Sequence, residues 1–172
     1  MKNIKSSGIN FEKKIVLLRL DLNVPLQNGK ITDTSRIDKI IPTLNFLIQK
    51  KAKIIILSHV GRPKGRIVKN LSLKPISLDL KKKLNTRVRL IKENIYEIKN
   101  KDFFEKFDEG ILILENIRFY AEEERNDKNF AMHLASLGDI YVNDAFSCSH
   151  RSHASIHQIS KYLPSFSGLQ LN

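Results

Sequence analysis

The 172-residue chain has little of what secreted or membrane-embedded proteins require. It contains one cysteine, Cys148, so no intramolecular disulfide can form, which fits a reducing compartment. Its longest apolar runs are too short to cross a bilayer. Residues 1–10 have no apolar stretch, and we therefore expect no secretory signal. These absences favour a cytoplasmic protein that does not contact a membrane.

Short nucleotide-binding and nucleic-acid-binding motifs are also missing. Neither Gly-x-x-x-x-Gly-Lys-Ser/Thr nor Gly-x-Gly-x-x-Gly occurs, and no helix-turn-helix or zinc-finger pattern is present. The net charge of +12 comes from scattered lysines, for example Lys81–Lys83, and scattered lysines are typical of solvated helix faces. We therefore expect no nucleic-acid partner, and an RNA-binding module remains only an alternative.

Four apolar segments that end in polar or cationic residues carry most of the information in this chain. They are Ile15–Asn23, Ile54–Arg62, Ile111–Arg118 and Ile140–Asp144. Continuous β-branched runs predict strands buried on both faces, as in a parallel sheet. Segments with helical spacing lie between these runs. This order predicts one domain over residues 1–172, an open, doubly wound, mostly parallel α/β sheet with helices on both faces.

Several local expectations follow from turn and capping residues. Asn28-Gly29 predicts a turn, and Pro42 predicts a kink or a loose first turn in the helix that contains it. Residues 95–107 fit one helix or two short pieces. Residues 152–162 predict a further helix, and Arg87–Ile91 a short strand.

The ends of the predicted strands are rich in cations. Ligands of open parallel sheets bind beyond the carboxyl ends of the strands. The basic residues expected at that edge are Arg36, His59, Arg62, Arg118, Arg151 and His153. Several cations at one edge repel each other unless an anion is bound, so the pattern predicts an anion site.

A cluster around Cys148 allows two other interpretations. Cys148, His150, His153 and Asp144 have spacing compatible with zinc, but the adjacent Arg151 would oppose a cation. Cys148 beside a histidine also suggests a thiolate nucleophile, yet no oxyanion-hole signature accompanies it. We therefore expect no metal site on this chain.

Four parts of the sequence together resemble the signature segments of the phosphoglycerate kinase family. These parts are Arg19–Pro25, Ser58–Pro63, Leu114–Phe119, and Val142–Phe146 with His150–His153. They occur in the family's order over nearly the whole chain. The resemblance implies a Rossmann-like, three-layer N-terminal lobe of a two-domain kinase, without the C-terminal nucleotide domain.

The resemblance also implies the residues that bind 3-phosphoglycerate or 1,3-bisphosphoglycerate. They are Asp21, Leu22, Asn23, Arg36, His59, Val60, Gly61, Arg62, Arg118 and Arg151. The last two arginines, with His59 and Arg62, would hold the phosphate that is not transferred. Asp21 would contact the hydroxyl and carboxyl region together with Asn23. Arg36 would be catalytic, stabilising charge on the transferred phosphoryl group.

The implied reaction is reversible phosphoryl transfer between 1,3-bisphosphoglycerate and Mg-ADP, giving 3-phosphoglycerate and ATP in glycolysis. Mg-ATP or Mg-ADP would be a co-substrate bound by the absent domain, so no cofactor site is expected here. The complete enzyme is expected to be a monomer, and this chain alone to bind the acid without catalysis. A non-catalytic anion-binding module is the alternative from another class.

Polar residues beside the site have structural interpretations as well. Arg19 fits either a buried partner of a carboxylate or a site residue. Glu115 and Asn116 are interpreted as orienting an arginine and tying loops together. Asn143 and Asp144 are interpreted as doing the same for the cations beyond the last strand.

Overall fold

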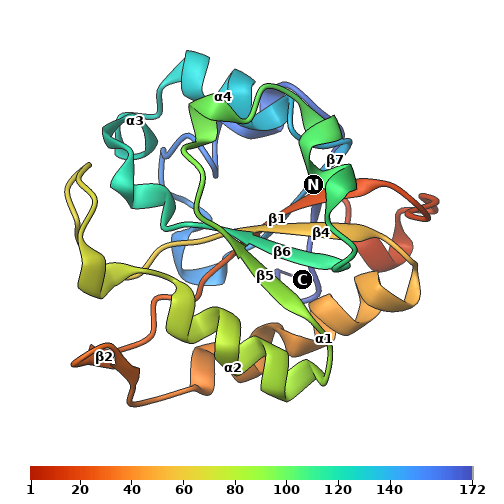
Figure 1. The fold of residues 1–172 in the computed structure, drawn as a ribbon. Coiled ribbons are helices and arrows are strands. Elements are labelled where there is room, and N and C mark those ends of the chain that lie inside the picture. The colour runs from red at the N-terminus through yellow and green to blue at the C-terminus, as the bar shows by residue number, and fades with distance from the viewer. Residues whose placement is uncertain (172) are drawn as a thin grey trace.

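A computed structural model of the protein describes residues 1–171, and its centre is a six-stranded sheet (Figure 1). The strands are β1 Ile15–Leu20, β4 Lys53–Leu57, β5 Val88–Ile91, β6 Ile111–Leu114, β7 Ile140–Asp144 and β8 Ser165–Ser167. Their spatial order is β5-β6-β4-β1-β7-β8, and every neighbouring pair is parallel. All carboxyl ends therefore lie at one edge.

The central strands form where the sequence is continuously apolar. All residues of β1 and β6 are buried, and so is every residue of β4 except Lys53. The register places Val16 opposite Ile54 on one side and Ile140 on the other. Helices cover both faces of such strands, which is why no alternation of polar and apolar residues is needed.

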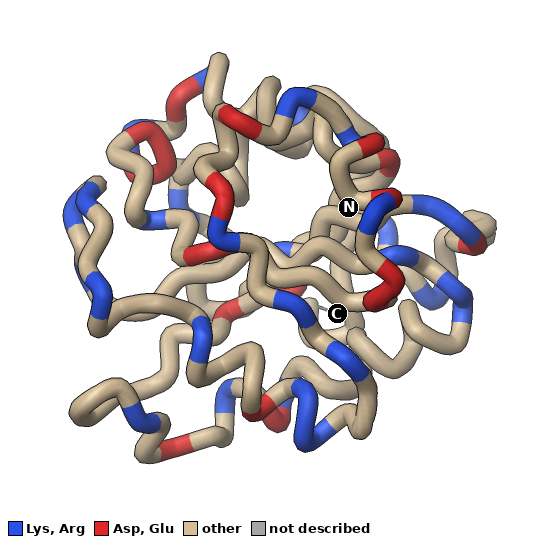
Figure 2. Tube along the Cα trace, in the orientation of Figure 1, with Lys and Arg blue, Asp and Glu red and all other residues tan. Residues whose placement is uncertain are grey.

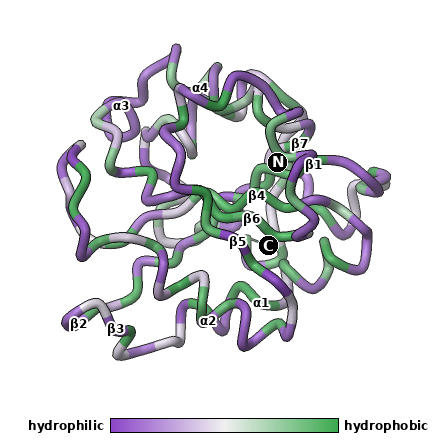
Figure 3. The backbone as a smooth tube through the Cα atoms, viewed as in Figure 1, coloured by the Kyte–Doolittle hydropathy of each residue, from purple (hydrophilic) through white to green (hydrophobic). Residues whose placement is uncertain are grey.

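Helices and short 3₁₀ turns form the outer layers. The α-helices are α1 Ser35–Gln49, α2 Lys74–Leu84, α3 Ala121–Glu124 and α4 Lys128–Ala135. The apolar residues of α1 and α2 join one core cluster, and those of α4 join a second cluster on the opposite face. Figure 1 shows the two layers below and above the sheet, and Figure 3 shows the green apolar strands between them. The predicted doubly wound α/β fold is confirmed.

The short hairpin after β1 confirms the predicted turn. Strands β2 Leu26–Gln27 and β3 Lys30–Ile31 pair antiparallel around Asn28 and Gly29, whose φ angles are 52° and 74°. Two positive φ angles in succession define the turn that matches the twist of a two-residue hairpin. Helix α1 then runs without interruption through Pro42.

The predicted helix over residues 152–162 is wrong. Only Gln158–Lys161 is helical there, as a 3₁₀ turn. The backbone N–H groups of Ala154 and Ser155 donate to Glu123, at 2.8 Å to its carbonyl oxygen and 2.7 Å to its carboxylate. These long-range bonds tie the backbone N–H groups at the start of the segment to a residue far away in the chain. Residues 95–107 form two short pieces, Ile95–Glu97 and Lys101–Lys106.

The first residues of the chain pack beside the last strand. The backbone N–H of Ser167 donates to the carbonyl of Lys2 at 2.8 Å, and Asn3 forms a parallel bridge with Ser167. The ends marked N and C both lie near the sheet in Figure 1.

Charged residues are spread over the loops and outer helices (Figure 2), consistent with solvated lysines. Within residues 1–171, no helix combines the length and the apolar composition needed for a membrane crossing.

Candidate functional site: an anion-binding edge of the sheet

The candidate residues follow four neighbouring strands of the parallel sheet. Asp21 follows β1, His59 follows β4, Arg118 lies in the 3₁₀ turn Ile117–Phe119 after β6, and Arg151 comes after β7. Because these strands are parallel and adjacent, the segments that follow them emerge at the same edge. This placement confirms that residues far apart in sequence share one edge of the sheet.

Four basic side chains form what we call the basic cluster: His59, Arg118, Arg151 and His153. Burial lowers the pKa of His153, and the nearby charges of Arg118 and Arg151 lower it further. Burial also lowers the pKa of Arg118, and Arg151 acts in the same direction. These directions are the ones expected where basic groups gather at one edge of the sheet.

The buried side chain of Arg19 fixes which ring nitrogen of His59 carries the proton. Nη2 of Arg19 lies 3.0 Å from Nδ1 of His59. Because a guanidinium can only donate, Nδ1 must accept, and the ring proton is on Nε2. Burial, followed by the charges of Arg19 and Arg118, lowers the pKa of His59 to about 2. His59 is therefore a neutral donor through Nε2–H rather than a cation.

Arg19 is itself held by a buried network. Its Nε donates to the hydroxyl of Ser155 at 2.8 Å, and its Nη2 lies 3.9 Å from the carboxylate of Glu123. Glu123 also accepts the hydroxyl proton of Ser155. Burial raises the pKa of Glu123, while Arg19 and the hydrogen bonds from Ser155 oppose that change. Arg19 is thus both a buried partner of a carboxylate and a residue that orients the site.

Two buried polar atoms of the basic cluster have no hydrogen-bond partner among the described residues. They are Nε of Arg118 and Nδ1 of His153. Buried polar atoms are nearly always satisfied by protein, water or a ligand. Two such atoms within one group of basic side chains fit an anion bound there.

A second part of the site is the Asp21–Arg36 pair. Nη1 of Arg36 donates to both carboxylate oxygens of Asp21, at 2.9 and 3.0 Å. The side chain of Arg36 is 43% exposed, whereas that of Asp21 is 11% exposed. The hydroxyl of Ser147 also donates to Asp21. Arg36 is therefore attached by one end only and keeps room to move.

A hollow of about 490 Å³ adjoins this pair. It is lined in part by Asn23, Arg36, Val60 and Gly61. The side-chain oxygen of Asn23 accepts the backbone N–H of Gly61 at 2.9 Å, which joins the segments after β1 and β4. Gly61 has a φ of 64°, and a Cβ there would lie 2.7 Å from the side chain of Leu71, so another residue would be strained and would displace that side chain.

Two expected site residues are placed differently from the rest. The side chain of Leu22 is fully buried in the core, and its backbone N–H donates to the hydroxyl of Ser58 at 3.1 Å. Arg62 is exposed beside Gly61, and within residues 1–171 it has no hydrogen bond or ion pair. Leu22 therefore packs in the core behind the end of β1, and Arg62 is exposed on the loop after β4.

The interpretation of Asn116 agrees with its contacts, and Asp144 also ties segments together, although its bonds do not orient the cations beyond β7. Asn116 accepts the backbone N–H of Arg118 at 3.0 Å and donates to the carbonyl of Val60 at 2.9 Å. Asp144 instead accepts from the hydroxyl of Thr43 at 2.6 Å and from the N–H of Gln170 at 2.8 Å. Both oxygens of Asp144 are therefore engaged with groups outside the basic cluster.

Sequence reasoning missed Ser147, Ser155 and Glu123. No motif marked these residues, because their partners are distant in the chain. Around Cys148, which is buried, the residues described bring no three potential metal ligands together. The zinc interpretation therefore receives no structural support.

The fold and this edge define a class of protein: a parallel α/β domain with basic side chains gathered beyond its strand ends. The family model of phosphoglycerate kinase matches residues 6–172. The chain belongs to the phosphoglycerate kinase family.

Individual relatives agree with that assignment. The chain is 52% identical to the phosphoglycerate kinase of Wolbachia pipientis wMel, over 98% of this chain and 42% of that protein. It is 48% identical to that of Orientia tsutsugamushi strain Ikeda, over 96% of this chain and 41% of that protein. The chain therefore spans about four tenths of the length of these relatives.

Solved structures give the same result. The phosphoglycerate kinase of Coxiella burnetii superposes with a TM-score of 0.87 at 38% identity, covering 98% of this chain and 42% of that one. That of Pyrococcus horikoshii OT3 gives 0.85 at 30% identity, covering 99% and 43%. The match is to the N-terminal lobe of these proteins.

Proposed function

We propose that this chain supplies the 3-phosphoglycerate site of a cytoplasmic, monomeric phosphoglycerate kinase of glycolysis. The observation that supports this most strongly is the basic cluster, with two buried nitrogen atoms, Nε of Arg118 and Nδ1 of His153, that lack a partner among the described residues. A phosphate with several oxygens can accept from Arg118, from Arg151 and from Nε2–H of His59. A guanidinium matches the geometry of a phosphate better than an ammonium does.

The rest of the substrate would extend from the basic cluster toward the Asp21–Arg36 pair. Asp21 and Asn23 offer oxygens and an amide to the hydroxyl and carboxyl groups. In the complete enzyme, Mg-ADP or Mg-ATP would be the co-substrate and would bind outside this chain. A carboxylate oxygen of 3-phosphoglycerate gains the phosphoryl group as the bond between that group and ADP breaks. The reverse transfer from 1,3-bisphosphoglycerate yields ATP.

Arg36 would contribute charge stabilisation to the transferred group. Phosphoryl transfer depends on positioning and electrostatics more than on a covalent intermediate. In the described structure Arg36 is bound only to Asp21, so the approach of a phosphoryl group can draw its free nitrogens away from solvent. This explains why the edge is rich in arginine.

The proposal is tested by calorimetric titration of the 172-residue chain with 3-phosphoglycerate at low and high salt. We expect saturable one-to-one binding that weakens little with salt, because two of the three donors, His59 and Arg118, are buried. A parallel titration with single-stranded RNA tests the alternative, in which affinity falls steeply with salt. The chain alone is expected to form no ATP from 1,3-bisphosphoglycerate and Mg-ADP. Absence of 3-phosphoglycerate binding would contradict the proposal.

A further inference from the structure

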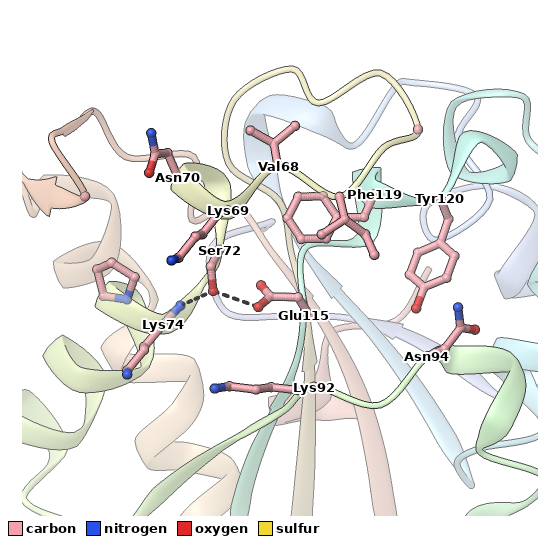
Figure 4. A pocket seen from close by; sticks show the side chains of 14 residues that line it. Val68, Lys69, Asn70, Ser72, Lys74, Lys92, Asn94, Glu115, Phe119 and Tyr120 are labelled. Atoms are coloured by element: carbon pink, nitrogen blue, oxygen red, sulfur yellow. Dashed lines mark hydrogen bonds between the residues drawn. The ribbon is translucent and has the colours of Figure 1, made fainter.

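A second hollow, of about 800 Å³, opens beyond the ends of β5 and β6 (Figure 4). The chain segment from Gly61 to Ser72 separates it from the smaller hollow, because Gly61 and Leu71 line the smaller one whereas Gly65 and Ser72 line this one. None of the residues of the basic cluster lines it. It is therefore a separate candidate site.

Three lysines from three different elements border this hollow. Lys69 lies in the 3₁₀ turn after Val68, Lys74 begins α2, and Lys92 follows β5. Within residues 1–171, no carboxylate lies within 4.0 Å of any of their ammonium groups. In Figure 4 the three side chains lie on one side of the hollow.

The one carboxylate in the lining is already engaged. Glu115 accepts the hydroxyl proton of Ser72 and the backbone N–H of Leu73, both at 2.7 Å. It also accepts the N–H of Asn116 at 2.9 Å. Three ammonium groups therefore face a single carboxylate that is turned toward the backbone, which leaves the hollow positively charged.

The opposite wall is apolar and rigid. Figure 4 shows the rings of Phe119 and Tyr120 there, both half-buried, with Val68 above them. The hydroxyl of Tyr120 accepts the N–H of Ile95 at 2.8 Å, which fixes the ring. Ile67 also lines the hollow and is 83% exposed. Such surface favours a ligand with a flat apolar group.

We propose that this hollow, the lysine pocket, binds a small phosphomonoester that carries an aromatic ring. The ammonium groups hold the phosphate, and the ring packs between Val68, Phe119 and Tyr120. Hollows of roughly 300–1,000 Å³ suit small molecules rather than a lone phosphate. A purely apolar ligand would leave the three ammonium groups uncompensated, so the lining as a whole favours an aromatic anion.

The test is a titration of the 172-residue chain with the probe 1-naphthyl phosphate at low salt. Backbone amide NMR of the chain monitors the binding. The titration is done on the chain carrying Arg118→Ala, so that the basic cluster competes less for the probe. We expect shift changes at residues 67–74, 92–94 and 119–120. Inorganic phosphate and 1-naphthol at equal concentration are expected to bind at least about tenfold more weakly, because each lacks half of the contacts.

Variants of the lining lysines decide whether the probe binds in the lysine pocket. In that background, Lys69→Ser and Lys92→Ser are each expected to weaken the probe by up to about fivefold, the range of exposed charge pairs. Lys81→Ser, an exposed lysine of α2 that does not line the pocket, is the matched control and should change nothing.

Three results would overturn the lysine pocket. They are unchanged affinity when Lys69 and Lys92 are both replaced, equal binding of 1-naphthol, and shift changes confined to the surroundings of His59. The readout does not depend on 3-phosphoglycerate, so it separates failure of this inference from failure of the proposed function.

Discussion

The basic cluster and the Asp21–Arg36 pair lie at the same edge of the sheet but are held in different ways. His59 is fixed from behind by Arg19, which is fully buried and bound to further buried groups. Arg36 is 43% exposed at its side chain and is bound to one carboxylate. A rigid end suits binding of a group that stays in place, whereas a loosely held arginine suits a group that is in transit.

The sharpest test of this contrast is Arg36→Ala in a full-length version of the protein that includes the nucleotide lobe. We expect turnover to fall by about 10³-fold or more, the effect of losing an arginine aimed at a transferring phosphoryl group. Affinity for 3-phosphoglycerate should change by less than about tenfold, because Arg36 is not part of the basic cluster. Steady-state kinetics and calorimetry measure the two effects, with Arg125→Ala as control. Near-normal turnover would refute the catalytic role.

The next effect concerns stability. Arg19→Met leaves Glu123 buried without its cationic partner, and we expect a loss of about 3–5 kcal/mol in the free energy of unfolding. Urea denaturation of the 172-residue chain measures it. Adding Glu123→Gln to the same chain removes the unpaired charge and should restore much of that loss. If Arg19→Met lowers the free energy of unfolding no more than a surface substitution does, the buried network around Arg19 does not stabilise this part of the fold.

Arg118→Ala tests the basic cluster directly. Loss of a charge-assisted hydrogen bond costs about 1.5–3 kcal/mol, which corresponds to roughly a 10- to 100-fold weaker affinity for 3-phosphoglycerate. Calorimetry of the 172-residue chain should show this loss at both low and high salt. If Arg118→Ala weakened the affinity for 3-phosphoglycerate less than Arg36→Ala does, the roles given to the basic cluster and to the Asp21–Arg36 pair would be reversed.

The smallest effect is on the pH dependence of stability. The folded-state pKa of His59 is lowered to about 2, from an unfolded value near 6.5. Between these values the unfolded chain binds a proton that the folded chain does not, so acid favours unfolding. From pH 7 to pH 5 this single group lowers the free energy of unfolding by about 2 kcal/mol.

Comparison with His59→Gln isolates that contribution, since the other acid-sensitive groups, including His153, are common to both chains. We expect the variant to lose less stability between pH 7 and pH 5. Nitrogen NMR of His59 should show the proton on Nε2 throughout this range. A midpoint of titration near pH 6.5 would show that Arg19 does not control this ring.

Much of the fold could be predicted because β1, β4 and β6 are continuous apolar runs, and parallel pairing then gathers the polar residues that follow them. The gathering of His59, Arg118 and Arg151 at one edge followed from that reasoning. The helix expected over residues 152–162 did not form, because the bonds to Glu123 depend on a partner far away in the chain. Local spacing contains no information about such a partner.

The same limit applies to the orientation of individual site residues. Nothing in the spacing of Arg19 predicts that it supports His59, and nothing beside Ser147 predicts its bond to Asp21. The contacts of Asp144 with Thr43 and Gln170 were equally invisible. Tertiary hydrogen bonds between distant segments require coordinates.

The contact between Lys2 and Ser167 has a practical consequence for rearranging the polypeptide. Because Lys2 and Ser167 are neighbours, a short peptide could join the segments that contain them, and new ends could be cut at the Asn28-Gly29 turn. The permuted chain would keep every strand of the sheet. The new ends would lie beside the lysine pocket, which Gly29 lines, and a reporter group attached there could follow ligand binding in solution.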